Sequence, residues 1–328
     1  MTTLKGPCAR WIRMLVVTLS MLTSVGAASV QAAEPLNLGL LRQARLFNTP
    51  GETIKPIEGT EIVEGTIVHD SLVRHYFLIR PVAVPRGAPA LLLLHALGLD
   101  ARRMANLTGA GRLAALYGVS IYLPDSVGNQ WHDDSAKTGP DDVGFLEALL
   151  RREIAVQGLD ANRIYVAGYS NGGFMAERMA CDKRELFAGL AMIASTLRPA
   201  LEARCAGTQQ MPMLQFNGLA DTVVPYKGTR DFSSAPASFA YWGLKNGCSP
   251  VAEDTALPDL ASDDGTRITM SRYPGCIASE VRLYTITGGG HTWPGSTDTR
   301  TIGATSLDID ATLELWQVLT AYSRLPSP

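Results

Sequence analysis

The sequence predicts an α/β fold with a mostly parallel central sheet and helices on both faces. Short apolar runs that are typical of strands buried on both faces recur along the chain. Segments with a helical spacing of apolar residues alternate with these runs. No repeat, low-complexity linker or change of composition interrupts the alternation. Because alternating strands and helices build a parallel sheet covered by helices, we expect residues 33–328 to form a single domain.

The expected strands differ in how their side chains alternate. Residues 33–60 are weakly patterned and are expected to be an extended lead-in. Residues 61–68 and 72–80 then alternate polar and apolar residues like a hairpin of half-buried strands. Most of the strands after the hairpin are apolar or β-branched runs, as buried strands are, and the last two are predicted as strands only. They cover residues 90–94, 119–123, 163–167, 187–195, 213–217, 266–273 and 281–286.

The expected helices lie between or after these strands. They cover residues 100–117, 141–157, 173–179, 239–246 and 308–322. In the second helix, acidic residues occupy the first turn, and Arg151 and Arg152 lie near the end, which complements the helix dipole. The fourth helix ends at Gly247, a residue type that favours the end of a helix.

Residues 1–32 have the pattern of a cleaved export signal. Lys5, Arg10 and Arg13 give a positive start, an apolar and small-residue run follows, and small side chains precede a cleavage site near Ala32. A retained membrane anchor is the alternative, but the run is short for a span and is diluted by Thr, Ser and Gly. We therefore expect export to the periplasm or the extracellular space.

The balance of charge argues against polyanionic partners. The whole chain has 29 basic and 31 acidic residues, and the signal segment removes three basic residues and no acidic one. The mature chain would carry 26 basic and 31 acidic residues, a formal net charge of −5. No basic excess is present to attract nucleic acid or an anionic membrane surface. We expect neither as a partner after signal cleavage, and we expect a monomer.

Four cysteines remain after the signal, which removes Cys8. An even number in an exported chain indicates disulfide bonds, and four cysteines allow three pairings. We choose Cys181 with Cys205 and Cys248 with Cys276, because each pair closes a modest local loop. A zinc site is the alternative, but no Cys-x-x-Cys or histidine spacing supports it.

The stretch Gly168-Tyr169-Ser170-Asn171-Gly172 predicts a nucleophilic serine. It reads Gly-x-Ser-x-Gly between an expected strand and an expected helix, which is the setting in which this pattern presents a nucleophile. The glycines allow the close backbone contacts of such a turn, and the N-terminus of the following helix favours a developing oxyanion. The alternative is an ordinary glycine-rich turn with an exposed serine. The rest of the chain favours Ser170 as the nucleophile.

A serine nucleophile needs a base, and the base needs an acid that orients it. His291 follows the last expected strand in a glycine loop and is the candidate base. Asp221 follows a buried strand by a short turn and is the candidate acid, although turn aspartates often bond only their own backbone. Weaker candidates in a polar segment are Asp259, Asp263 and Asp264. The chain order Ser170, Asp221, His291 is that of an α/β-hydrolase.

The tetrahedral intermediate of acyl transfer needs N–H donors for its oxyanion. The expected donors are the backbone N–H of Asn171, directly after the nucleophile, and that of Leu97, in the loop after the first buried strand. Ala96 is the fallback for the second donor. His95 would then shape this loop and would not act as the base.

Four strings stand out as a set. Residues 168–173, 217–226, 246–248 and 289–295 read Gly-Tyr-Ser-Asn-Gly-Gly, Asn-Gly-Leu-Ala-Asp-Thr-Val-Val-Pro-Tyr, Asn-Gly-Cys and Gly-Gly-His-Thr-Trp-Pro-Gly. Together they resemble the polyhydroxybutyrate depolymerase and feruloyl esterase family of secreted serine esterases, from roughly residue 60 to the end of the chain. The resemblance implies an α/β-hydrolase fold and the triad Ser170, Asp221 and His291. It also implies a bond from Cys248 to a later cysteine, which suits Cys276.

Two positions depart from the family pattern. His95-Ala96 stands where the family usually has His-Gly, and the Cβ of alanine narrows the backbone angles available to the oxyanion loop. His132 stands where a smaller polar residue is expected, and we predict that it touches substrate. Trp131 and Trp293 are expected in loops on the catalytic edge, where each could stack on an aromatic acyl group or along an aliphatic polyester. The alternative is that each packs its own loop.

The sequence therefore predicts an exported serine esterase that hydrolyses a small or oligomeric ester through an acyl-enzyme, with no metal or organic cofactor. A polyhydroxyalkanoate, a feruloyl sugar and small soluble esters are all open as substrates. A serine peptidase of the same fold is one alternative, but the chain has no long additional domain of the kind that such peptidases often carry. A catalytically silent binding module is another, and the complete Ser, Asp and His set argues against it.

Overall fold

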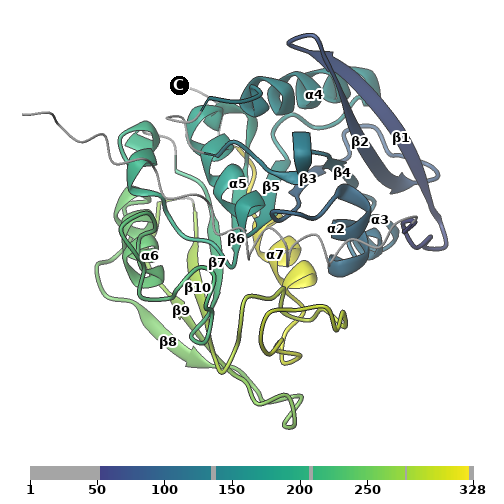
Figure 1. Cartoon of the computed structure of the whole chain (residues 1–328). Coiled ribbons are helices and arrows are strands. Elements are labelled where there is room, and N and C mark those ends of the chain that lie inside the picture. Colours follow the sequence, from purple (N-terminus) through teal and green to yellow (C-terminus); the bar gives the residue numbers. More distant parts are fainter. Residues whose placement is uncertain (1–51, 134–137, 207–209, 278, 325–328) are drawn as a thin grey trace, which may run out of the picture. The chain divides into compact units, whose positions relative to one another are not determined.

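The described chain is built around one sheet of ten strands (Figure 1). A computed structural model describes residues 52–133, 138–206, 210–277 and 279–324. The predicted export signal and the predicted lead-in up to residue 51 lie outside these ranges. Across the sheet, the strands follow the order β1-β2-β4-β3-β5-β6-β7-β10-β9-β8.

The six strands at the centre of the sheet run parallel to one another. They are β4 Ser120–Pro124, β3 Ala90–Leu94, β5 Ile164–Tyr169, β6 Gly189–Ile193, β7 Met213–Gly218 and β10 Val281–Thr287. The outer strands pair antiparallel, and they are β1 Thr60–His69, β2 Leu72–Pro81, β9 Arg267–Arg272 and β8 Glu253–Ala256. Since all six parallel strands end at the same edge of the sheet, the loops that follow them gather there.

Helices cover both faces of the sheet. One face carries α2 Ala101–Thr108, α3 Gly111–Tyr117 and α7 Ala311–Leu319, and the other carries α4 Asp142–Gln157, α5 Asn171–Asp182 and α6 Ala235–Lys245. Short 3₁₀ turns are Val127–Asn129, Arg184–Leu186, Pro199–Leu201 and Arg204–Ala206. In β3, Leu91 and Leu93 pack with the first set of helices, whereas Leu92 and Leu94 pack with the second. The predicted α/β fold with a mostly parallel sheet is therefore confirmed.

Several element bounds shift by two or three residues, and three larger differences from the sequence prediction have a clear physical cause. Residues 100–117, expected as one helix, form α2 and α3, because Gly109 adopts a left-handed conformation (φ 59°) and its N–H bonds back to the end of α2. Helix α6 begins at Ala235 and not at residue 239, because the Ser234 side chain accepts a hydrogen bond from its first turn. Strand β8 was not expected, because all four of its side chains are exposed and none marks a buried face.

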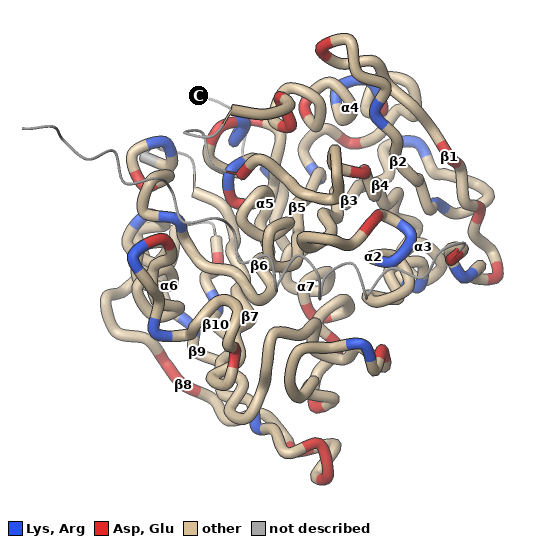
Figure 2. The backbone as a smooth tube through the Cα atoms, in the orientation of Figure 1, with Lys and Arg blue, Asp and Glu red and all other residues tan. Residues whose placement is uncertain are grey.

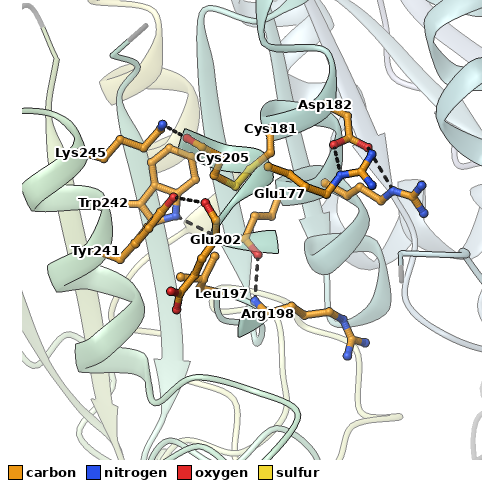
Figure 3. Close-up of a disulfide and its surroundings, with 12 residues drawn as sticks. Glu177, Cys181, Asp182, Leu197, Arg198, Glu202, Cys205, Tyr241, Trp242 and Lys245 are labelled. Atoms are coloured by element: carbon orange, nitrogen blue, oxygen red, sulfur yellow. Dashed lines mark hydrogen bonds and ion pairs between the residues drawn. A yellow bond between two sulfur atoms is a disulfide. The ribbon is translucent and has the colours of Figure 1, made fainter. Parts of the chain in front are cut away.

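Both predicted disulfide bonds are present in the structure. The bond between Cys181 and Cys205 fastens the end of α5, the helix that begins directly after Ser170 (Figure 3). At the same end of α5, the Asp182 carboxylate accepts two hydrogen bonds from the Arg204 guanidinium, at 2.7 and 2.6 Å. A covalent bond and a bidentate ion pair therefore hold the helix to the same short segment.

None of the helices in the described ranges is long and apolar enough to span a membrane. Figure 2 shows basic and acidic residues interspersed along the described chain. Exposed ion pairs follow from this arrangement, such as those of Arg151 with Glu147 and Glu185. Exposed pairs contribute little to stability, so the two-sided core and the disulfide bonds are the main stabilising features.

The bond between Cys248 and Cys276 is expected to stabilise the fold. Cys248 follows α6 and Cys276 lies between β9 and β10, so the bond closes a loop with a sequence separation of 28 residues that contains β8. Replacing both cysteines with serine should lower the free energy of unfolding by about 3–4 kcal/mol, because the unfolded chain gains entropy. It should also expose residues 249–275 to proteases.

Denaturant unfolding and limited proteolysis with mass spectrometry measure these two effects. The matched control replaces Cys181 and Cys205 with serine, which should leave residues 249–275 protected. An unchanged free energy of unfolding, or first cleavage at another loop, would contradict the prediction.

Candidate active site

Ser170 lies at the tip of a sharp turn between β5 and α5. Its φ of 54° and ψ of −118° put a residue with a side chain in a backbone region that sterics disfavour. The Ser170 N–H donates to the Ile193 carbonyl of β6 at 2.8 Å, and the Ser170 carbonyl accepts from the N–H groups of Gly173 and Phe174. The neighbouring strand and the first turn of the helix therefore hold this conformation from both sides.

The glycines around Ser170 are required by close contacts. A Cβ on Gly172 would lie 2.3 Å from the carbonyl oxygen of Leu94, and a Cβ on Gly168 would lie 2.0 Å from that of Gly172. A Cβ on Gly173 would lie 2.0 Å from Oγ of Ser195. Non-bonded atoms do not approach so closely, so only glycine fits these positions. The steric role that the motif predicts for its glycines is confirmed.

His291 and Asp221 form a buried hydrogen-bonded pair. Nδ1 of His291 lies 2.7 Å from Oδ2 of Asp221, and both side chains are almost fully buried. The other carboxylate oxygen accepts hydrogen bonds from the N–H groups of Val223 and Val224, at 2.8 and 2.9 Å. A carboxylate held in this way accepts the Nδ1 proton, which leaves Nε2 as the basic nitrogen of the imidazole.

Parallel pairing of β7 with β10 brings this pair together. Asp221 follows β7 and His291 follows β10, and the two strands are neighbours with Ile286 opposite Gly218. A Cβ on Gly218 would lie 2.2 Å from the carbonyl oxygen of Gly289, so the two loops pack backbone against backbone. The sheet thus joins two residues that are 70 positions apart in the sequence.

Tyr169 and Ile302 orient the candidate base. The Tyr169 hydroxyl donates to the His291 carbonyl at 2.7 Å, and its ring stacks on the imidazole with centroids 5.4 Å apart. Burial, together with the charge of Asp221, raises the pKa of Tyr169 far above its usual range, so the hydroxyl remains a donor. The His291 N–H donates to the Ile302 carbonyl at 2.7 Å. The imidazole is therefore fixed through both its backbone and its ring.

A cavity of about 80 Å³ opens beside these groups. Ser170, Tyr169 and His291 line it. Its apolar lining residues are Ala96, Leu97, Leu99, Leu107, Val223 and Ile302. Arg103 and Arg300 are its charged lining residues. The candidate nucleophile and the candidate base therefore share one largely apolar cavity, which is the usual form of a small-molecule site.

Two backbone N–H groups near Ser170 are free to donate. Asn171 is the first residue of α5, and the first N–H groups of a helix have no partner within it. Leu97 lines the cavity, and its backbone N–H has no hydrogen-bond acceptor in the described part of the chain. Ala96 does not adopt a positive φ, whereas Gly98 does (φ 78°). The alanine is therefore compatible with the loop, and the left-handed position falls on a glycine.

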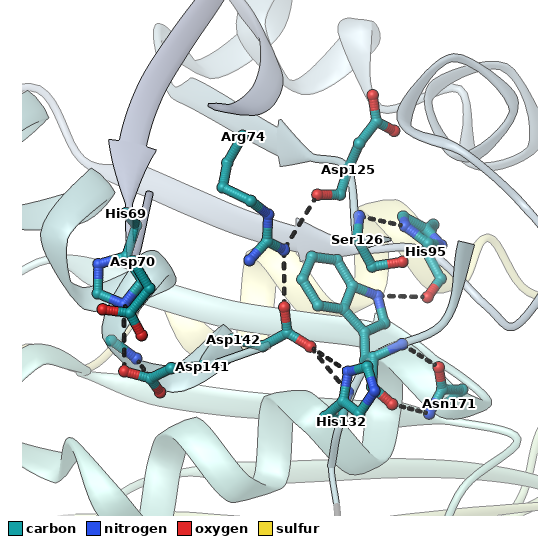
Figure 4. Close-up of polar contacts among 12 residues, drawn as sticks. His69, Asp70, Arg74, His95, Asp125, Ser126, His132, Asp141, Asp142 and Asn171 are labelled. Atoms are coloured by element: carbon teal, nitrogen blue, oxygen red, sulfur yellow. Dashed lines mark hydrogen bonds and ion pairs between the residues drawn. The ribbon is translucent and has the colours of Figure 1, made fainter. Parts of the chain in front are cut away.

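His95 shapes the loop after β3, as predicted (Figure 4). Its Nε2 accepts a hydrogen bond from the Ser126 N–H at 3.1 Å, and its Nδ1 lies 2.8 Å from the Ala96 carbonyl oxygen. Burial lowers the pKa of the His95 imidazole, which keeps it neutral. The ring packs against Trp131, with centroids 5.0 Å apart. Both ring nitrogens are occupied, so His95 is not available as a base.

Both tryptophans that were expected to contact substrate are buried outside the cavity lining. Trp131 has no exposed surface, and its indole N–H donates to the His95 carbonyl at 2.9 Å. Trp293 is 1% exposed, and its indole N–H donates to the Thr312 hydroxyl at 3.0 Å. The prediction is wrong for both residues, because each ring packs its own loop onto the fold and its polar atom is already satisfied.

His132 also lies outside the cavity lining. Its backbone N–H and its Nδ1 both contact Oδ2 of Asp142, at 2.8 and 3.1 Å (Figure 4). Asp142 is buried and accepts a further hydrogen bond from Arg74 at 2.6 Å, and the His132 carbonyl accepts one from Arg178. The structure thus gives His132 an anchoring role at the start of α4 in place of the predicted substrate contact.

Sequence reasoning missed three contributions to the site. Tyr169 supports His291 from the position directly before the nucleophile. The Asn171 side chain accepts from the Trp131 N–H at 2.7 Å and donates to the Asp133 carboxylate at 3.0 Å, so it fixes the neighbouring loop. For Tyr169 and Asn171, the position directly beside Ser170 in the sequence was the available sign of a role in the site. Arg103 gave no signal, because arginine on a helix is usually exposed.

Of the residues that the structure describes, His69, Asp70 and Asp141 lie close enough together to hold a metal ion. Asp141 already caps α4 through the Gly144 N–H and lies 3.1 Å from Nε2 of His69. None of the three lines the cavity, and both carboxylates are exposed. The cluster therefore has no role in the chemistry at Ser170.

Comparison with known proteins places this chain among esterases. Residues 74–241 match the family described as Esterase PHB depolymerase. NocK, a protein of Nocardia uniformis subsp. tsuyamanensis named as an esterase, is 30% identical over 240 residues, which are 66% of this chain and 68% of that protein. Feruloyl esterase B of Piromyces equi is 27% identical over 63% of this chain and 40% of its own length. Poly(3-hydroxyalkanoate) depolymerase C of Paucimonas lemoignei is 25% identical over 70% of this chain and 62% of its own length.

Solved structures give the same fold. A thermostable esterase superposes with a TM-score of 0.53 at 18% identity, covering 80% of this chain and 63% of its own. The acetyl xylan esterase from Aspergillus awamori also has a TM-score of 0.53, at 14% identity, covering 70% of this chain and 94% of its own. Together with the sheet order, these similarities confirm the expected α/β-hydrolase fold.

Proposed function

Because the chain belongs to the Esterase PHB depolymerase family and is a carboxylic ester hydrolase, we propose that it is a serine esterase that acts through Ser170, His291 and Asp221. The observation that carries the proposal is the buried contact of 2.7 Å between His291 and Asp221, beside a cavity that Ser170 also lines. Nucleophile, base and orienting acid then follow the chain order of the fold.

The proposed reaction has two steps. Oγ of Ser170 attacks the ester carbonyl while Nε2 of His291 takes its proton, and the tetrahedral intermediate collapses to an acyl-enzyme as His291 gives the proton to the leaving alcohol. Water then attacks the acyl-enzyme with His291 again as base, which releases the acid and restores Ser170. Asp221 holds the imidazole tautomer and stabilises the imidazolium that forms in each step.

The oxyanion would be held by backbone donors. The N–H groups of Asn171 and Leu97 are both without a partner in the described structure and both lie next to the cavity or the nucleophile. Asn171 also begins α5, so the positive end of the helix dipole adds to its hydrogen bond. Such preorganised donors supply a large share of catalysis in acyl transfer.

The size of the cavity favours a short aliphatic acyl group. A cavity of about 150 Å³ accommodates benzene, whereas the cavity beside Ser170 has about 80 Å³. A feruloyl group, an aromatic ring on a propenoyl chain, is therefore too large for this cavity alone, while an acyl chain of a few carbons fits. We favour esters of short aliphatic acids, 3-hydroxyalkanoate units among them, over feruloyl esters.

Export is part of the proposal. The pattern of residues 1–32 and two disulfide bonds, which persist in oxidising compartments, support it. Protein recovered from the periplasm or the culture medium should begin near Ala33 and contain no free thiol, as intact mass and thiol titration can measure. A full-length chain in the cytoplasm with four free cysteines outside the signal would contradict this part.

Replacing Ser170 with alanine tests the nucleophile. The variant should keep the fold and lose ester hydrolysis, with a fall in kcat on the order of 10⁶, as for the nucleophile of a serine protease. Initial rates on p-nitrophenyl acetate measure the loss, and the unfolding temperature checks the fold. An organophosphate should label Ser170 in the wild-type protein. Activity above about a tenth of wild type, or labelling of another serine, would rule out Ser170 as the nucleophile.

Replacing Asp221 with asparagine tests the acid. Asparagine keeps the shape but presents an N–H to Nδ1 and so favours the wrong imidazole tautomer, a change that costs about 10⁴ in kcat in a serine protease. The matched control is Asp263→Asn, an exposed acid in the segment that offered the weaker candidates. Steady-state kinetics on the same ester should show the loss for Asp221→Asn alone. Comparable activity of the two variants would mean that another acid orients His291.

A further inference from the structure

The cavity beside Ser170 and His291 contains a buried arginine that the proposed mechanism does not use. Arg103 lies on α2, is 1% exposed and lines the same cavity. Its charge acts on Tyr169, whose ring stacks on His291: burial raises the pKa of Tyr169, and the charge of Arg103 opposes that rise. A buried guanidinium is costly unless it is fully paired.

One edge of the Arg103 guanidinium is occupied and the other is free. Nη1 forms an ion pair with Asp298 and lies 3.6 Å from Oε1 of Glu52. Nε and Nη2 are buried and have no hydrogen-bond partner in the part of the chain that the structure describes. These two nitrogens carry the parallel N–H groups of the guanidinium side, which match the two oxygens of a carboxylate. Buried donors are almost always hydrogen-bonded to protein, water or a ligand, so this edge can receive an acceptor that enters the cavity.

Arg103 lies among other charged residues. A polar pocket adjoins the cavity and shares Arg103 and Arg300 with it. The charged residues that line this pocket are Lys55, Arg103 and Arg300 on one side and Glu52 and Asp298 on the other. Against the effect of burial, the hydrogen bond from Arg103 helps to lower the pKa of Asp298 to about 2, so Asp298 is a full anion. A carboxylate on the free edge of Arg103 would join a pocket that Lys55 and Arg300 also line.

The cavity walls suit a short hydrocarbon spacer. Leu99, Leu107 and Ile302 line the cavity together with Ser170 and Arg103. A few methylene groups would bury apolar surface against these side chains. A neutral ester carbonyl offers one strong acceptor oxygen, whereas a carboxylate offers two in the plane of the free edge.

We propose that Arg103 binds a carboxylate at the far end of the acyl group, so that the preferred substrates are half-esters of short dicarboxylic acids. The inference rests on the proposed function at Ser170. Hydrolysis consumes one water and releases an alcohol and a dicarboxylate, and the carboxylate on Arg103 takes no part in making or breaking bonds. Arg103 would thus select the substrate through its charge and its planar pair of donors.

Matched substrates test the selectivity in the wild-type protein. Ethyl half-esters of malonate, succinate, glutarate and adipate are each compared with the ethyl ester of the corresponding monoamide, which has a similar shape and no charge. At the best chain length, kcat/KM should be about 10- to 100-fold higher for the half-ester, the range expected from hydrogen bonds to a charged group. Chromatography of the released acid gives the rates.

Equal kcat/KM for half-ester and amide at every chain length would overturn the proposal. Hydrolysis of p-nitrophenyl acetate is measured in parallel. If the wild-type protein did not hydrolyse p-nitrophenyl acetate, the proposed function itself would be disproved. Failure of the half-ester proposal and failure of the proposed function are therefore distinguishable.

Two variants separate the geometry of Arg103 from its charge. Arg103→Lys keeps a cation beside Asp298 but loses the pair of parallel N–H groups. Lys55→Met is the matched control, because it removes an exposed cation from the adjoining pocket. The ratio of half-ester to amide kcat/KM should fall at least about tenfold in Arg103→Lys and change less than about threefold in Lys55→Met. Equal falls in both variants would mean general attraction of anions and would overturn the assignment to Arg103.

Inhibition of the wild-type protein gives a test that needs no variant to fold. Glutarate and pentanoate have the same chain length and differ in the second carboxylate. Glutarate should compete with p-nitrophenyl acetate with an inhibition constant at least about tenfold lower than that of pentanoate. Equal inhibition by the two acids would overturn the proposal.

Discussion

The backbone conformation of Ser170 is the constraint on which the rest of the site depends. A residue with this φ and ψ is disfavoured by about 1–3 kcal/mol, and it persists only where its surroundings determine it. Here the bond to Ile193 and the glycine contacts at Gly168 and Gly172 do so, because any Cβ at these glycines would overlap a carbonyl oxygen. The close packing of β5 against α5 in turn places the first N–H of the helix beside the serine, where its partial positive charge can act on a developing oxyanion.

The sheet then brings the second oxyanion donor, the acid and the base of the proposed site to this turn. Leu97 follows β3, Ser170 follows β5, Asp221 follows β7 and His291 follows β10, and all four strands are parallel and end at the same edge. None of these residues is close to the next in sequence, so the geometry of the site is a property of strand order and register. This explains why loops with few regular elements can hold atoms at hydrogen-bond distance. Each functional residue follows its strand by a short segment. Backbone hydrogen bonds hold these segments in place, such as the bond from the His291 N–H to the Ile302 carbonyl.

Local chemistry and the buried strands could be predicted from the sequence, whereas the burial of single side chains in loops could not. The strand–turn–helix around Ser170, the glycine loop before His291 and the paired cysteines are patterns with a local physical cause, and the structure contains each of them. The errors concern long-range packing. The indole N–H of Trp131 donates to the carbonyl of His95, 36 residues away in the sequence, and no local sequence pattern predicts such a partner. The break at Gly109 is different, since a glycine inside a helical pattern was a visible signal of a helix end.

Two cations share one apolar cavity in the proposed reaction. Arg103 is charged at all times, and His291 becomes charged each time it takes the serine proton. Like charges repel, so the imidazolium that forms in each step is repelled by the guanidinium in the same cavity. Asp221 offsets the charge on His291 and Asp298 offsets part of that on Arg103, but the free edge of the guanidinium is left uncompensated. A substrate carboxylate on that edge would offset this repulsion in the transition state, so its binding would affect kcat as well as KM.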